Sequence, residues 1–331
     1  MTWLTWRQFR AQTLVTGGAL ALLAVYLIYL GGEIRTFYDT RIASCEAQAC
    51  YLARMDFRAD FDDAISLMVV LLIAVPALIG IFWGAPLVTQ ELEQRTDRLV
   101  WNQSVTRTRW LAVKLTVIGS FSALATGVFS LLLTWSTSRY DQVIGERFAA
   151  LSFDSRNIVP IGYGLFAFVL GTVSGMIVRR TLPAMAITLS LFGTLQLLIP
   201  TAVRQNLMPP VTETVTVDAS VLNSGVGIHL NENNTFDIQG YTGGGDWSLD
   251  FSSPLFRADG SPYTGEDNRP CLLPGDPEAS NACMAAQNLH FEYNHQPGRR
   301  YWTFQWIELS MYTALAFLLA GFGFFWLRRH V

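Results

Sequence analysis

The sequence predicts an all-α polytopic membrane protein with six transmembrane helices, an N-terminal interfacial elbow helix and a small β-rich extracellular domain between spans five and six. Hydrophobic residues make up 51% of the 331 residues, and charged residues only 15%, against roughly 25% in ordinary soluble domains. Six apolar stretches approach the roughly 20 residues that a helix needs to cross a bilayer. The one long polar segment lies between the last two stretches.

The chain divides at these stretches into four parts. Residues 1–13 form the elbow helix, 14–202 hold spans one to five, 203–306 form the extracellular domain, and 307–331 hold span six and the tail. The predicted spans are 14–30, 64–87, 111–135, 158–178, 184–202 and 307–327. A cleaved signal peptide is the alternative for the first, but the run is long for such a segment and no A-x-A lies close behind it.

The N-terminal segment places aromatic and basic side chains at helical spacing. These residues are Trp3, Trp6, Arg7 and Arg10. Such a helix suits the membrane interface, where tryptophan and arginine are favoured. A disordered leader is the alternative, which the paired tryptophans argue against.

Basic residues give the orientation, because they are enriched in cytoplasmic loops. With both termini cytoplasmic, the inner segments hold 11 basic and 3 acidic residues, and the outer segments 12 basic and 23 acidic residues. The four cysteines then all lie outside, where disulfides persist. Nearest-neighbour pairing, Cys45 with Cys50 and Cys271 with Cys283, is predicted among three possibilities, and free thiols are the alternative.

Local patterns predict how several elements are built. "FRADFDDAISL" (57–67) predicts a helix that leads into span two, where Pro76 should introduce a kink. "GIFWG" (80–84) and "GTVSG" (171–175) are small-xxx-small patterns that permit close helix packing. In the extracellular domain, "VTETVTVDASV" (211–221), "LHFEYNH" (289–295) and "RRYWTFQW" (299–306) are typical of strands.

Catalytic chemistry is not expected in this chain. Lys114 is its one lysine and follows no glycine-rich loop, which excludes a P-loop. His290 and Glu292 fall on the opposite strand face from His295, which argues against a metal site. The spans hold few ionisable residues, which disfavours an ion-coupled carrier. Glu308 is expected at the outer edge of span six, within reach of water.

The segment 88–110 between spans two and three is amphipathic and basic. Its apolar members are Leu92, Leu99, Trp101, Val105 and Trp110, and its cationic members are Arg95, Arg98, Arg107 and Arg109. Tryptophan and arginine are enriched at interface hot spots, which favours a protein partner. The pattern is equally compatible with tryptophans at lipid headgroups and arginines on anionic lipid.

This segment resembles the first cytoplasmic loop of ABC-2 type permeases, the membrane subunits of ATP-binding cassette exporters. Their pattern is roughly E-x-E-x-G-T-x-x-L, then a Pro-Val-Ser-Arg turn, then a lysine that opens the next span. The matching residues here are Glu91, Glu93, Thr96, Leu99, Val105, Thr106, Arg107 and Lys114. Arg95 and Ser104 depart from it, where glycine and proline are usual. The elbow, the six spans, the insertion before span six and the "FQWIE" segment (304–308) also resemble that family.

The resemblance implies a half-transporter with no cofactor of its own, in the plasma membrane. A separate ABC ATP-binding subunit would bind ATP and Mg²⁺ and contact a coupling helix within 91–109, with the elbow and "RRTLP" (179–183) nearby. The residues that would meet it are Glu91, Glu93, Arg95, Thr96, Arg98, Leu99, Trp101, Arg107 and Arg109. Whether the two glutamates contact the cassette or only cap the helix is open. A second permease chain, identical or related, and the lipid bilayer are the other partners, and no nucleic acid is expected.

Two other classes of protein fit parts of the sequence. A non-transporting membrane receptor or assembly protein would bind a ligand through its extracellular domain and would have no ATPase partner. A membrane enzyme would need a polar cluster at the bilayer edge, for which only Glu308 and Arg300 offer a hint.

Overall fold

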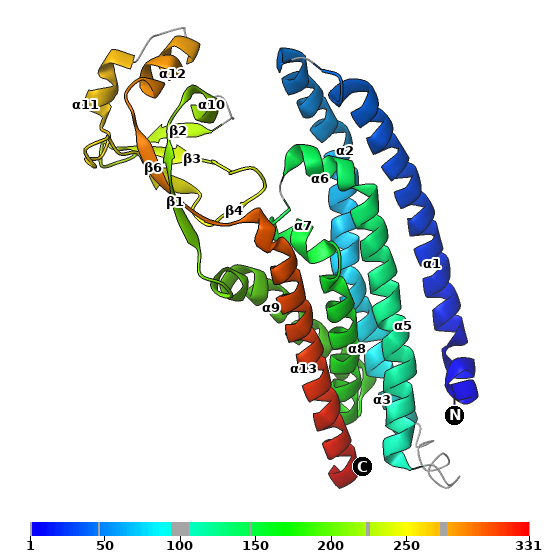
Figure 1. Cartoon of the computed structure of the whole chain (residues 1–331). Helices are drawn as coiled ribbons and strands as arrows, with labels where there is room; N and C mark the ends of the chain where they lie inside the picture. The colour runs from blue at the N-terminus through cyan, green and yellow to red at the C-terminus, as the bar shows by residue number, and fades with distance from the viewer. Residues whose placement is uncertain are drawn as a thin grey trace. The chain divides into compact units, whose positions relative to one another are not determined.

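The computed structural model describes residues 2–45, 47–93, 106–145, 147–222, 226–271 and 277–330. The chain forms two compact units. The helical unit comprises Met1–Gly145, Ala149–Arg204 and Trp302–Val331, and the β-rich unit comprises Glu146–Phe148 and Gln205–Tyr301. Figure 1 shows the helices and strands of both units in chain order.

Long helices dominate the helical unit. They are α1 (Thr2–Phe37), α2 (Ala47–Ile79), α5 (Arg107–Ser136), α8 (Val159–Val178), α9 (Thr181–Leu198) and α13 (Tyr301–His330). Shorter helices connect them: α3 (Ala85–Glu93), α6 (Ser138–Ile144) and α7 (Ala150–Ser155). Single π-helical turns follow α1, α2 and α9, at Tyr38–Ile42, Gly80–Gly84 and Ile199–Val203.

Six segments are long and apolar enough to cross a membrane, which confirms the six predicted spans. Their bounds are Leu14–Ile42, Leu52–Glu91, Arg107–Ser136, Val159–Val178, Thr181–Asn206 and Gly298–Arg329. Most extend well beyond the apolar runs. The first belongs to a helix that starts at Thr2, whose residues 2–13 have no described side chains. An elbow helix in the interface therefore stays a prediction.

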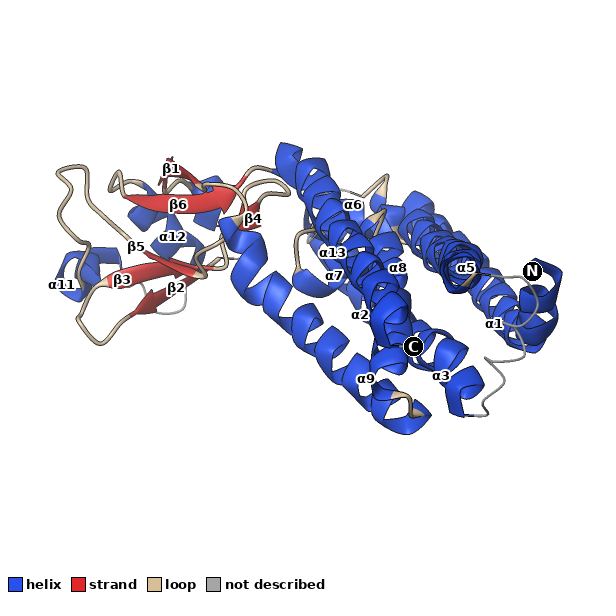
Figure 2. Ribbon diagram, turned by 90° about the horizontal axis from the view of Figure 1, so that it is seen from below, coloured by secondary structure: helices blue, strands red, loops and turns tan. Residues whose placement is uncertain are grey.

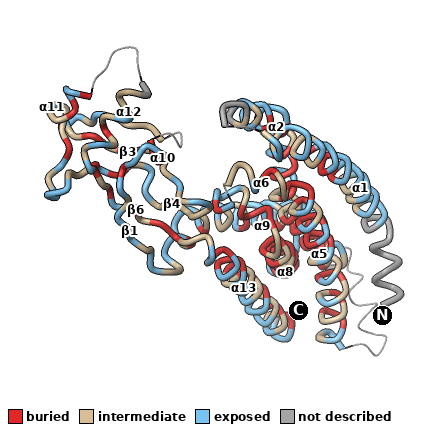
Figure 3. Tube along the Cα trace, turned by 45° about the horizontal axis from the view of Figure 1, so that its top comes forward, coloured by how far each residue is buried: buried red, intermediate tan, exposed pale blue. Residues whose placement is uncertain are grey.

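Helix α8 is the centre of the helical unit. In its apolar window 78% of the residues are buried, against 17% in the first and last spans. It contacts α2, α3, α5 and α9, and Figure 3 shows it as a largely buried tube. Pro160 lies in its first turn, where the missing N–H costs nothing, and Arg179 ends it in a left-handed conformation (φ 56°).

The two glycine patterns pack against each other. A Cβ added at Gly80 would lie 2.7 Å from the carbonyl oxygen of Ala167, and one at Gly175 would lie 2.7 Å from that of Ala85. Gly84 and Gly171 meet the backbone of the facing helix still more closely. The expectation of close packing is confirmed, because α8 approaches the π-helical turn and α3 at backbone distance.

The β-rich unit contains two three-stranded antiparallel sheets. One has the order β1 (Val211–Thr216), β6 (His290–Gln296), β4 (Trp247–Ser248), and the other β2 (Gly227–Leu230), β3 (Phe236–Gln239), β5 (Ser252–Pro254). Short helices α10 (Ala219–Leu222), α11 (Gly265–Asn268) and α12 (Pro277–Ala285) complete it. Figure 2 shows its strands in red.

Sequence patterns predicted two of these strands and misjudged a third segment. The strands expected within 211–221 and 289–295 are β1 and β6, and they pair with each other. The strand expected over 299–306 is wrong, because Gly298–Arg300 form a 3₁₀ turn and α13 begins at Tyr301. Tyr301, Phe304, Gln305, Glu308 and Tyr312 are buried, which is helical spacing.

Both predicted disulfides are present. Cys45 is bonded to Cys50 and Cys271 to Cys283, with Cα–Cα distances of 5.1 Å and 5.3 Å. The first follows α1 and closes the turn before α2. The second joins the residues before α12 to that helix, and Cys271 belongs to the buried core of the β-rich unit.

Candidate functional site

Two polar clusters lie near opposite ends of helix α8. The first surrounds the end of α3 and the start of α5, which flank the predicted coupling loop 88–110. The structure describes 88–93 and 106–110 of this loop. Five of the predicted contact residues, Arg95, Thr96, Arg98, Leu99 and Trp101, lie outside the described residues.

Glu91 and Lys114 join the two helices that flank the loop. The Lys114 Nζ atom donates to Glu91 Oε1 at 2.7 Å and to the carbonyl oxygen of Leu87 at 3.1 Å. It also lies 4.4 Å from the centre of the Trp110 ring. The lysine side chain is 4% exposed and that of Glu91 13%. The last turn of α3 is therefore fixed to the first turns of α5.

Glu93 joins the loop to the start of α9. Its carboxylate accepts hydrogen bonds from the Thr181 N–H at 2.8 Å and from the Thr181 hydroxyl at 3.1 Å. That hydroxyl also lies 3.0 Å from the Thr89 hydroxyl. A carboxylate at the first turn of a helix satisfies a free N–H group and interacts favourably with the helix dipole. The segment "RRTLP" thus neighbours the loop.

The described residues of the coupling segment divide into two groups. Glu91 and Glu93 have partners within the chain. Glu93 caps the start of α9, not a coupling helix within the loop. Arg107 and Arg109 are exposed in the first turn of α5. Thr106 precedes that turn and its hydroxyl accepts a hydrogen bond from the Arg109 N–H. The described start of α5 therefore presents two basic side chains at its surface.

Replacing Lys114 by methionine should lower the free energy of unfolding by about 1 to 3 kcal/mol, because Glu91 then keeps a largely buried carboxylate without its cation. The double variant Lys114→Met, Glu91→Gln should regain part of this loss. Thermal unfolding of the purified chain measures both variants. Strictly additive losses would contradict a direct interaction between the two side chains.

The second cluster contains Glu308, and the expectation that this residue reaches water is wrong. Its side chain is 0% exposed, and the Arg204 side chain is 1% exposed. Arg204 donates through Nε to Glu308 Oε2 at 2.9 Å and through Nη2 to Glu308 Oε1 at 3.0 Å. Buried charges require such pairing, because an isolated charge is costly to remove from water.

Asp154 and Tyr163 complete this buried ion network, the name we give to Asp154, Tyr163, Arg204 and Glu308. Arg204 forms an ion pair with Asp154, whose side chain is 5% exposed. The Tyr163 hydroxyl lies 2.5 Å from Glu308 Oε1 and 3.2 Å from Asp154 Oδ1. The network joins α7, α8, the end of span five and α13. It lies within the helical unit, near the start of α8, whereas Glu93 contacts a residue just after the end of α8.

Neighbouring groups fix the same junction. Gln305 accepts hydrogen bonds at 3.3 Å from the N–H groups of Ile158 and Val159, at the start of α8. Its amide also donates to the carbonyl oxygen of Phe153 at 3.3 Å. The Arg204 guanidinium lies 4.2 Å from the centre of the Phe153 ring. Arg300, which the sequence grouped with Glu308, instead bonds Pro209 and Gln296.

Burial dominates the electrostatics of Asp154, which lies outside the six membrane-spanning segments. Removal from water raises the pKa of this carboxyl to about 6, although the Arg204 cation acts in the opposite direction. Glu308 nearby raises the pKa of Asp154 further. Sequence reasoning missed the network because its members are far apart in the chain, and only the helical spacing around Glu308 offered a signal.

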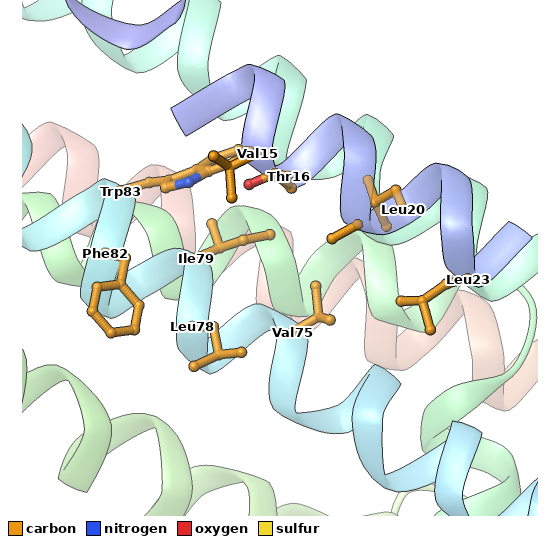
Figure 4. Close-up of a pocket in the computed structure, with 10 residues that line it drawn as sticks. Val15, Thr16, Leu20, Leu23, Val75, Leu78, Ile79, Phe82 and Trp83 are labelled. Carbon is orange, nitrogen blue, oxygen red and sulfur yellow. The ribbon is translucent and has the colours of Figure 1, made fainter. Parts of the chain in front are cut away.

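An apolar cavity of about 540 Å³ lies between α1 and the end of α2. Its lining residues are Val15, Thr16, Ala19, Leu20, Leu23, Val75, Leu78, Ile79, Phe82 and Trp83. Figure 4 shows these side chains, with Thr16 as the one hydroxyl among them. The cavity is suited to hydrocarbon and offers no group for catalysis.

Six helices long and apolar enough to cross a membrane indicate a multi-pass membrane protein, and their number fits a permease. The chain belongs to the family described as ABC-2 membrane transporter related, whose model matches residues 17–204. The match covers nearly all of the first five spans, both glutamates of the loop and Arg204. No curated protein and no solved structure matches the chain significantly.

Proposed function

We propose that the chain is the permease subunit of an ABC exporter, driven by ATP hydrolysis in a separate ATP-binding subunit. Membership of the ABC-2 related family carries this proposal, because that family implies association with an ABC ATP-binding subunit. A P-loop needs a lysine after its glycines. The single lysine, Lys114, instead serves the Glu91 contact, which supports placing ATP and Mg²⁺ in the partner.

The contact surface would be the segment between α3 and α5. Arg107 and Arg109 are exposed there, while Glu91 and Glu93 connect its flanks to α5 and α9. Helix α3 also approaches α8 at backbone distance through Gly175. A displacement of the loop by the ATP-binding subunit would therefore move α3, α5, α8 and α9 together.

Orientation and assembly follow from the same family and from the charge distribution. Both termini and the loop would be cytoplasmic and the β-rich unit extracellular, in the plasma membrane, because basic residues favour the inner side. The two disulfides would then lie on the oxidising side. One six-span chain would form half of a transport unit, so a second permease chain, identical or related, would complete it.

Copurification with the ATP-binding subunit encoded beside this chain tests the proposal. Wild type should retain that subunit in detergent, and the variant Trp101→Ala, Arg107→Ala should lose most of it. The matched control Trp302→Ala, Arg299→Ala removes the same residue types from the start of span six, away from the loop. This variant should retain the ATP-binding subunit. Equal retention by all three proteins would contradict the contact. Failure of wild type to retain any ATP-binding subunit would favour the receptor alternative.

A further inference from the structure

We propose that the buried ion network is a proton-binding site, in which Asp154 takes up one proton from water and returns it when the network is opened. This goes beyond transport driven by ATP, and it concerns groups that belong to this chain alone. The argument rests on charge, on hydrogen-bond geometry and on which helices the network joins.

The charges of the network do not balance without a proton. Arg204 carries one positive charge, and Asp154 and Glu308 carry two negative charges when both are ionised, with all three side chains 5% exposed or less. Tyr163 and Tyr312 also face them, and these phenols are neutral near pH 7. Gln305 and Phe153, which contact the same junction, carry no charge. A net negative charge would thus remain buried, which is costly.

The hydrogen bonds indicate which carboxyl takes the proton. Both oxygens of Glu308 accept hydrogen bonds from Arg204, so this carboxylate forms a two-point contact with the guanidinium. Asp154 meets the same guanidinium through Oδ1. The Tyr163 hydroxyl has a single proton but lies within hydrogen-bond distance of both carboxyls. If that proton goes to Glu308, a proton on Asp154 can in turn be donated to the Tyr163 oxygen.

The environment of Asp154 sets the pH at which this happens. Its pKa is raised to about 6, chiefly by burial, while the ordinary value is about 3.9. The folded chain therefore binds more protons than the unfolded chain between these two values. The contribution of Asp154 to the free energy of unfolding is therefore largest at acidic pH, and it falls as the pH rises between these two pKa values.

The position of the network couples the proton to helix movement. Its four residues come from α7, α8, the segment after α9, and α13. Separating these elements would break both ion pairs of Arg204 and admit water to Asp154. The carboxyl would then return to its ordinary pKa and release the proton wherever the pH lies between that value and about 6. Opening of this end of the helical unit would thus release one proton, and closing would take it up.

Infrared titration of the full chain in lipid nanodiscs tests the assignment, with no ATP-binding subunit present. The band of a protonated carboxylic acid should appear in wild type as the pH falls, with a midpoint near 6. Asp154→Asn, which resembles the protonated side chain in shape, should lose this band. The control Asp62→Asn should keep it, although Asp62 is also hydrogen-bonded, to Tyr140 at 2.8 Å.

Other outcomes would overturn the proposal. A band that persists in Asp154→Asn would assign the proton elsewhere, and a wild type without a titrating band near this pH would exclude the site. A midpoint that falls when sodium replaces choline would show that a metal cation occupies the network instead. Should Asp154→Asn fail to fold, Asp154→Glu keeps the carboxyl but moves it, and an unchanged midpoint there would contradict the assignment.

Discussion

Replacing Arg204 by methionine should lower the free energy of unfolding by about 3 to 5 kcal/mol, the range observed when one partner of a buried ion pair is removed. Methionine keeps much of the length of arginine but leaves Asp154 and Glu308 facing each other without a cation. The loss should be larger at neutral than at acidic pH, because protonation of Asp154 removes one of the two charges. Thermal unfolding of the detergent-purified chain at several pH values measures it.

A second arginine provides the matched control. Arg257 forms an ion pair with Asp267 at 3.1 Å in the β-rich unit, but its side chain is 43% exposed. Arg257→Met should therefore cost less than about 1 kcal/mol, as exposed pairs do. Equal losses for the two variants would contradict a buried network at Arg204. Addition of Glu308→Gln to Arg204→Met should restore part of the stability.

Replacing Gly171 by alanine should destabilise the helical unit by about 1 to 3 kcal/mol, because the added methyl group overlaps the backbone of the Gly80–Gly84 turn. A backbone carbonyl cannot rotate away as a flexible side chain can. Helix α8 would have to move away from its neighbours, so the fraction of folded protein after heating should fall. The same thermal assay measures the effect.

Gly193→Ala is the control for this variant. Gly193 also lies in a spanning helix, α9, but nothing lies within 4 Å of a Cβ added there. Alanine is the better helix former, so this substitution should be neutral or slightly stabilising. A Gly171→Ala variant as stable as Gly193→Ala would contradict the backbone contact between α8 and the turn at Gly80.

Features that depend on local sequence could be predicted. Apolar length identified the six spans, because a bilayer of fixed thickness demands it. The glycine patterns identified the closest helix contacts, since only a residue without Cβ permits backbone approach. Proximity in sequence identified both disulfides.

Features that depend on tertiary contacts could not be predicted. Asp154, Arg204 and Glu308 are separated by 50 and 104 residues along the chain, and each taken alone looks like a charge at the end of a span. Glu91 and Glu93 followed the family pattern, yet their bonds to Lys114 and Thr181 required the packing of three helices. The alternating aromatic residues at 299–306 predicted a strand, but from Tyr301 onward the segment is the first part of helix α13.

The two clusters together support a mechanical account of the permease. At one end, Glu91, Glu93 and Lys114 connect the loop to three helices. At the other end of α8, Arg204 connects the end of span five to Asp154 of α7 and Glu308 of α13. Helix α8 contributes Tyr163 to the second cluster, and its C-terminal end lies three residues before Thr181. A push at the loop would thus reach the buried ion network through one rigid helix.

Site-directed cross-linking tests the central claim, that an ATP-binding subunit contacts the chain at this loop. All four native cysteines are in disulfides, so Arg109→Cys would introduce a single free thiol. A bifunctional reagent should link it to the ATP-binding subunit, and Trp302→Cys, at the other end of the spanning helices, should give no such product. A link from Trp302→Cys, or none from Arg109→Cys in a complex that still copurifies, would contradict the account.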